Sequence, residues 1–144
     1  MPSPTDFPTT GKVTAVKDDI VLFVPRGTTY EMHLKLIGAA PAIGTPVDAL
    51  IRVNARKVWT VPSGGNFLVP IMGATKIVQG QVRYCDDKQL VVKAGVNVIV
   101  NLPTADSAVD LPNGPIAVGQ MVNVTALPGA SVEFVSSPAA VTTA

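Results

Sequence analysis

One stretch of sequence decides the fold: residues 11–24, which read GKVTAVKDDIVLFV. Two strand-length runs, at 12–16 and 20–24, flank the triplet Lys17-Asp18-Asp19. Aspartate side chains bond nearby backbone amides and tolerate left-handed backbone conformations, so this triplet is typical of a tight turn. The stretch therefore predicts a β-hairpin.

The composition favours the same kind of element throughout the chain. The 144 residues include 23 valines but only 9 leucines, together with 12 glycines and 13 prolines. β-branched side chains fit a pleated sheet, and the Gly/Pro punctuation keeps each element short. No window free of Gly and Pro carries a helical apolar stripe, so we expect an all-β fold. Further strands are expected over 30–36, 46–53, 57–61 and 67–72, with a turn at Asn54-Ala55-Arg56.

The pattern then starts again. Gly80-Gln81-Val82 resembles the beginning of the first hairpin, and Asp86-Asp87 falls where Asp18-Asp19 fell. A closing run at 131–135 parallels 57–61. The unchanged order of these matches predicts two degenerate tandem repeats. About five short strands per repeat fit a small barrel of the OB or SH3-like kind, with the two units packed together.

This interpretation divides the chain into four segments. Residues 11–78 form the first barrel repeat and 79–135 the second, with 71–79 as the segment that crosses between them. A unit of about 65 residues buries only about 60% of its chain surface, so the two repeats are expected to pack together. The outer segments, 1–10 and 136–144, are expected to be loose tails.

Charge and cysteine content exclude several classes. The formal net charge is +1 and only 15% of residues are charged, so no strong field favours nucleic acid or a membrane surface. The single cysteine cannot form an internal disulfide. No apolar run approaches the ~20 residues that span a bilayer, and the N-terminal residues lack a signal-peptide pattern. We expect a cytoplasmic protein without membrane contact.

Catalytic and metal constellations are missing. The one histidine, His33, has no nucleophile and orienting acid nearby in sequence, and Cys85 is expected to be a small buried hydrophobe. A zinc site cannot be built from one Cys and one His. The sequence therefore predicts no enzyme, no metal site and no cofactor.

Two local features have both a chemical and a structural interpretation. The aspartate pairs, Asp18-Asp19 and Asp86-Asp87, could ligate a cation, but turn formation explains their recurrence better. The loop Ser63-Gly64-Gly65-Asn66 could present backbone amides to an anion, although a hairpin loop is the simpler interpretation.

The two repeats differ in charge. Residues 11–78 hold eight basic and four acidic residues, a net +4, whereas 79–144 are net −2. Part of the excess lies in Arg52, Arg56, Lys57 and Trp59, with Arg26, Tyr30 and His33 close if the hairpins align. Cations beside an aromatic ring suit a nucleic-acid or anionic-ligand site. Alternatively, Trp59 fills the barrel and the cations protect an edge strand from pairing with another chain.

Low charge favours a different function. A short chain with few charges hides apolar surface most readily against copies of itself. Leu50, Met121, Leu127 and Val132 stand on strands where some solvent-facing polar residues would be expected. The leading hypothesis is a non-enzymatic module that self-associates through apolar strand faces, and the alternative is ligand binding by the basic face of the first repeat.

Overall fold

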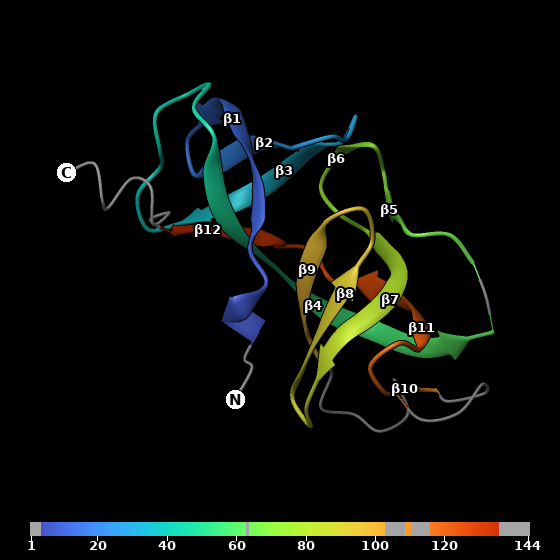
Figure 1. The fold of residues 1–144 in the computed structure, drawn as a ribbon. Coiled ribbons are helices and arrows are strands. Elements are labelled where there is room, and N and C mark those ends of the chain that lie inside the picture. Colours follow the sequence, from blue (N-terminus) through green and yellow to red (C-terminus); the bar gives the residue numbers. More distant parts are fainter. Residues whose placement is uncertain (1–3, 63, 103–108, 111–115, 136–144) are drawn as a thin grey trace.

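The protein is all-β over the residues that the computed structural model describes, namely 4–62, 64–102, 109–110 and 116–135 (Figure 1). The elements in this part of the chain are a short 3-10 helix η1 (Pro4–Asp6) and the strands β1 (Thr9–Lys17), β2 (Ile20–Pro25), β3 (Glu31–Ile37), β4 (Val47–Val61), β5 (Phe67–Val69), β6 (Met72–Gly73), β7 (Ile77–Cys85), β8 (Gln89–Lys93), β9 (Asn97–Asn101), β10 (Val109–Asp110), β11 (Met121–Ala126) and β12 (Ser131–Val135). These strands join in one mixed sheet.

The strand pairings form two closed circuits that share β4. In the first, β1 pairs with β2, β2 with β3, β3 with β12, β12 with β4, and β4 again with β1. In the second, β4 pairs with β11, β11 with β7, β7 with β8, β8 with β9, and β9 again with β4. Figure 1 shows β4 running from one group of strands into the other. Each circuit has one parallel pairing, β3 with β12 or β9 with β4.

One apolar core extends through both circuits. Its buried side chains come from the hairpins β1–β2 and β7–β8 and from the shared strand β4, and many are valines, as the composition predicted. Leu50 leaves this core and packs with Val91 and Ile99 on the opposite face, where Phe7 and Tyr84 cover them. β4 is therefore apolar on both faces near its start.

The predicted turn at Asn54-Ala55-Arg56 is wrong, because β4 is continuous from Val47 to Val61. Thr125 pairs with Lys57 and Ala126 pairs with Ala55, which leaves Arg56 as the extra residue of a β-bulge. Asn and Arg in an otherwise alternating run resemble a turn in sequence. Here the bulge absorbs one residue without breaking the strand.

The first residues are more ordered than the sequence suggests. Residues 4–10, placed above in a loose tail, contain η1 and the beginning of β1, where Thr9 and Thr10 pair with Ala49 and Asp48. The other predicted tail, 136–144, lies outside the described residues. β12, assigned by sequence to the second repeat, pairs with β3 and β4 in the first circuit. No helix in the described part of the chain is long and apolar enough to cross a membrane.

Candidate functional site

The predicted contact residues all lie on β4 and all point away from the main core. Arg52 and Trp59 are half-buried, whereas Arg56 and Lys57 are exposed. The bulge at Arg56 explains why two neighbouring residues both reach the surface, since the buried positions change from Ala55 to Val58 across it. The strand thus presents a row of polar and aromatic side chains on its outer face.

The structure does not leave all of these cations available to an anionic ligand. Arg52 Nη1 lies 2.9 Å from Glu133 Oε1 on the neighbouring strand β12, and both side chains are partly exposed. An ion pair of this kind contributes little to stability but offsets the charge of Arg52. The positive surface of β4 is therefore centred on its second half.

Lys57 and Trp59 form the best-defined pair on this face. Lys57 Nζ lies 5.8 Å from the centroid of the Trp59 ring, within the range of a cation–π contact. The backbone of Trp59 pairs with Asn123 of β11 on one side and Asp110 of β10 on the other. β4 also pairs on both sides near its start, with β1 and β12. The interpretation of these cations as edge-strand protection is therefore wrong.

The three residues expected near this set have partners outside it. Arg26 follows β2 and shares a pocket with the beginning of β4, nine residues along the strand from Arg56. The Tyr30 hydroxyl accepts a hydrogen bond from the Leu68 amide at 3.0 Å. His33 is partly exposed and lies 3.3 Å from Glu31. Arg26 is therefore separated from Lys57 and Trp59 by most of the length of β4.

The aspartate pairs occupy turns, as predicted. Asp18 has a φ of 55° in the β1–β2 turn. In the β7–β8 turn, Asp86 Oδ1 accepts hydrogen bonds from the Lys88 and Gln89 amides, both at 2.7 Å. Tyr84 donates its hydroxyl proton to Asp86 Oδ2 at 2.7 Å. The Tyr84 bond, followed by the two backbone bonds, lowers the pKa of Asp86, and the same Tyr84–Asp86 bond raises the pKa of Tyr84.

No candidate metal cluster is found in the described residues, where no group of three or more His, Cys, Asp or Glu side chains converges. His33 lies on β3 and Cys85 at the end of β7. Cys85 is half-buried and packs against the main core. Of the loop at 63–66, Ser63 lies outside the described residues, and the Gly65 carbonyl accepts a hydrogen bond from the Gln79 side chain at 3.3 Å.

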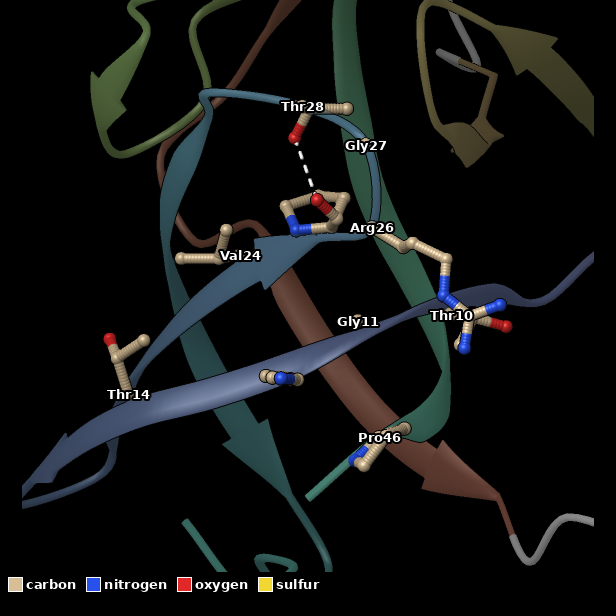
Figure 2. A pocket seen from close by; sticks show the side chains of 10 residues that line it. Thr10, Gly11, Thr14, Val24, Arg26, Gly27, Thr28 and Pro46 are labelled. Atoms are coloured by element: carbon tan, nitrogen blue, oxygen red, sulfur yellow. Dashed lines mark hydrogen bonds between the residues drawn. The ribbon is translucent and has the colours of Figure 1, made fainter. Parts of the chain in front are cut away.

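A pocket of about 350 Å³ that the sequence did not predict lies on the β1–β2 hairpin (Figure 2). Thr10, Lys12 and Thr14 contribute from β1, and Val24 and Arg26 from β2 and the turn that follows it. Thr28 and Pro46 complete the lining at the turn and at the start of β4. The alternation of β1 predicts that Thr10, Lys12 and Thr14 share one face of the strand. Only the pairing of β1 with β2 brings Arg26 beside them.

A second missed feature is an exposed apolar segment, residues 67–72, which runs from β5 to β6. Phe67, Val69, Ile71 and Met72 are exposed, with Ile71 and Met72 at 57% and 63% of their full accessibility. Leu68 is buried and fixes the segment to the core. Together with Thr29 and Tyr30, the segment lines an open hollow.

Comparison of the chain with protein-family models, with curated proteins and with solved structures gave no match.

Proposed function

We propose that this protein is a non-enzymatic interaction module that self-associates through the exposed apolar segment 67–72. The observation that carries the proposal is the run of exposed apolar side chains at Phe67, Val69, Ile71 and Met72. Contiguous apolar surface is uncommon on monomeric proteins and marks sites of association. The low charge of the chain favours a second copy as the partner, because such an interface has little need for charged groups.

The segment is held in place before any partner binds. β5 pairs with β7 of the second circuit, and β6 pairs with β3 of the first. The Leu68 amide donates to the Tyr30 hydroxyl, and the Glu31 amide donates to the Ile71 carbonyl at 2.8 Å. A fixed surface loses little conformational entropy on binding, which favours association.

The contact surface differs from the one that the sequence suggested. Leu50 and Val132 are only 3% and 0% exposed, so the fold itself buries them. Met121 is half-buried and Leu127 is exposed. The surface proposed for association is therefore the segment 67–72.

The test is light scattering coupled to size-exclusion chromatography, across a concentration series and at two salt levels. We expect a stable multiple of the chain mass that salt does not change, and a shift to monomer for Ile71→Lys. Ile43→Lys is the matched control, because Ile43 is 61% exposed but lies outside the segment. A wild-type monomer at all concentrations, or equal effects of both variants, contradicts the proposal.

We further propose that the chain consists of two degenerate tandem repeats, and that each barrel-like circuit takes most of its strands from one repeat. Three observations support this. Lys12 pairs with Val24 in one hairpin and Gln81 with Lys93 in the other, so both strands of the second hairpin lie 69 positions further along. Each hairpin has a register shift at the same relative position, between Val13 and Ala15 or between Val82 and Tyr84. The Gly44 amide bonds to the Val13 carbonyl as the Gly119 amide bonds to that of Val82.

The second candidate function is anionic-ligand or nucleic-acid binding by the outer face of β4. The Lys57–Trp59 pair favours it, because an aromatic ring beside a cation suits a nucleobase and its phosphate. The test is quenching of Trp59 fluorescence by a single-stranded oligonucleotide at several salt concentrations.

The variants for this test replace residues on the outer face of β4. Trp59→Phe removes the fluorophore, so its binding is measured by oligonucleotide anisotropy. We expect that variant and Arg56→Ala to weaken binding, and affinity to fall as salt rises. Arg83→Ala, an exposed arginine on β7, is the control. This function is excluded if the affinity does not depend on the salt concentration, or if Arg56→Ala binds as tightly as the wild type.

A further inference from the structure

We propose that the pocket on the β1–β2 hairpin binds a small carboxylate with an apolar body (Figure 2). This site differs in place and chemistry from the apolar segment 67–72. The pocket has two cations, Lys12 of β1 and Arg26 of the turn that follows β2. Both side chains belong to exposed residues, and neither has a carboxylate partner within ion-pair distance in the described part of the chain.

Arg26 is the cation shared by the pocket and the hollow beside it. It lines both the main pocket and a neighbouring hollow formed with Thr10, Pro46, Val47 and Asp48. Figure 2 shows its side chain extended in the direction of Thr10. A guanidinium group presents a planar fork of donors that matches a carboxylate with two parallel hydrogen bonds.

The rest of the lining selects an apolar body rather than a highly charged ligand. Val24, Pro25 and Pro46 supply apolar surface, and Gly11 adds no side chain. The three threonine hydroxyls already donate to protein acceptors: Thr10 to Asp48, Thr14 to the Leu22 carbonyl and Thr28 to the Pro25 carbonyl. A volume of about 350 Å³ is at the lower end of the range for small-molecule sites.

Asp48 limits the charge that the site accepts. Its carboxylate accepts the Thr10 hydrogen bond and lines the adjoining hollow. Two cations beside one carboxylate leave a net charge of about +1, which one carboxylate matches. A phosphate dianion would exceed this charge by one and would meet the Asp48 carboxylate.

The corresponding surface of the second hairpin carries its cations at other positions, with Lys93 in the place of Val24 and Arg83 in the place of Thr14. With the register of the two hairpins superimposed, Lys12 corresponds to Gln81 and Arg26 to Gly95. The Gln81 side chain donates to the Gly119 carbonyl at 3.3 Å, and the Tyr30 ring lies beside Gly95. An arginine beside the apolar Val24 and Pro25 is therefore an arrangement of the first hairpin, and the fold does not require it.

The experiment is an NMR titration of amide signals with hexanoate at constant ionic strength in a phosphate-free buffer. We expect saturable shifts confined to the β1 residues around Lys12 and the turn around Gly27. Arg26→Gln should weaken binding about tenfold, because it removes the charge-assisted pair. Arg83→Gln is the matched control and should leave the affinity unchanged. Asp48→Asn should strengthen binding.

Three further probes define the ligand class. Butyrate should bind more weakly than hexanoate, by about fourfold for each buried methylene removed. Hexanol, which lacks the charge, and inorganic phosphate, which lacks the apolar body, should both bind more weakly than hexanoate. The proposal is overturned by shifts that do not saturate, by an Arg26→Gln variant that binds as well as wild type, or by phosphate binding as tightly as hexanoate. Unchanged thermal unfolding of Arg26→Gln shows that a loss of binding is not a loss of folding.

Discussion

In each hairpin, one glycine of the first strand allows the backbones of the two strands to approach closely. A Cβ at Gly11 would lie 2.5 Å from the Val24 carbonyl oxygen and 2.9 Å from the Pro25 Cα, both backbone atoms. A Cβ at Gly80 would collide with the carbonyl group of Lys93. Only glycine allows the backbones to approach so closely. The sequence showed both glycines, but only the pairing gives the reason for them.

Replacement of Gly11 by alanine should therefore destabilise the protein. The backbone atoms that surround the position cannot move without disturbing β2, so we expect a loss of about 2 kcal/mol in the free energy of unfolding. Denaturant titration measures it. Gly65→Ala is the control, because its Cβ would come no closer than 3.6 Å to Phe67 and should cost less than about 0.5 kcal/mol. Equal losses at both positions would refute the close-approach explanation.

The Tyr84–Asp86 hydrogen bond leads us to expect that the pKa of Tyr84 depends on Asp86. The carboxylate raises the pKa of the Tyr84 phenol above its usual value of 10.0, so Asp86→Asn should lower it again. The stabilisation from the raised phenol pKa is present below that usual value and is lost as the pH rises through the folded-state pKa. NMR titration of the tyrosine ring carbon measures the shift. Asp87→Asn should have little effect, since Asp87 is the weakest contributor.

At the scale of elements, β4 shows where local sequence patterns succeed and fail. Alternation predicted that Lys57, Trp59 and Val61 share a face, and all three are less buried than Val58 and Thr60. The same pattern could not predict continuity through Asn54-Ala55-Arg56. A bulge breaks the alternation by one residue, and only the partner strand shows which residue is extra.

The bulge can be tested by deletion. Removal of Arg56 leaves Ala55 buried, Lys57 exposed and Val58 buried, which restores regular alternation, so we expect a change within about 1 kcal/mol. Removal of Asn54 instead directs Arg56 into the core position of Ala55, and we expect a loss of about 3 kcal/mol or more. Denaturant unfolding and amide spectra compare the two variants. If the Arg56 deletion unfolds the protein, the extra residue is not Arg56.

At the scale of the whole molecule, the two halves exchange strands. β12, late in the chain, completes the first circuit, and β4, early in the chain, completes the second. Hairpins arise from local signals, so the hairpins and the all-β class could be predicted from the sequence. The exchange could not, because the choice of a distant partner depends on which strand edges remain open once the hairpins have formed. The pocket around Arg26 could not be predicted for the same reason, because residues from β1, β2 and the start of β4 form it together.

The exchange predicts that neither half folds alone. A fragment of residues 1–78 lacks β12, which separates β3 from β4, and a fragment of 79–144 lacks the strand between β9 and β11. Each fragment would expose the core that both circuits share, and units of about 65 residues are marginal even when complete. We expect poorly dispersed amide spectra for each fragment and a folded spectrum when the two are mixed in equal amounts. A cooperatively folded fragment 1–78 would instead show that the first circuit closes without β12, and that the halves are independent domains in contact.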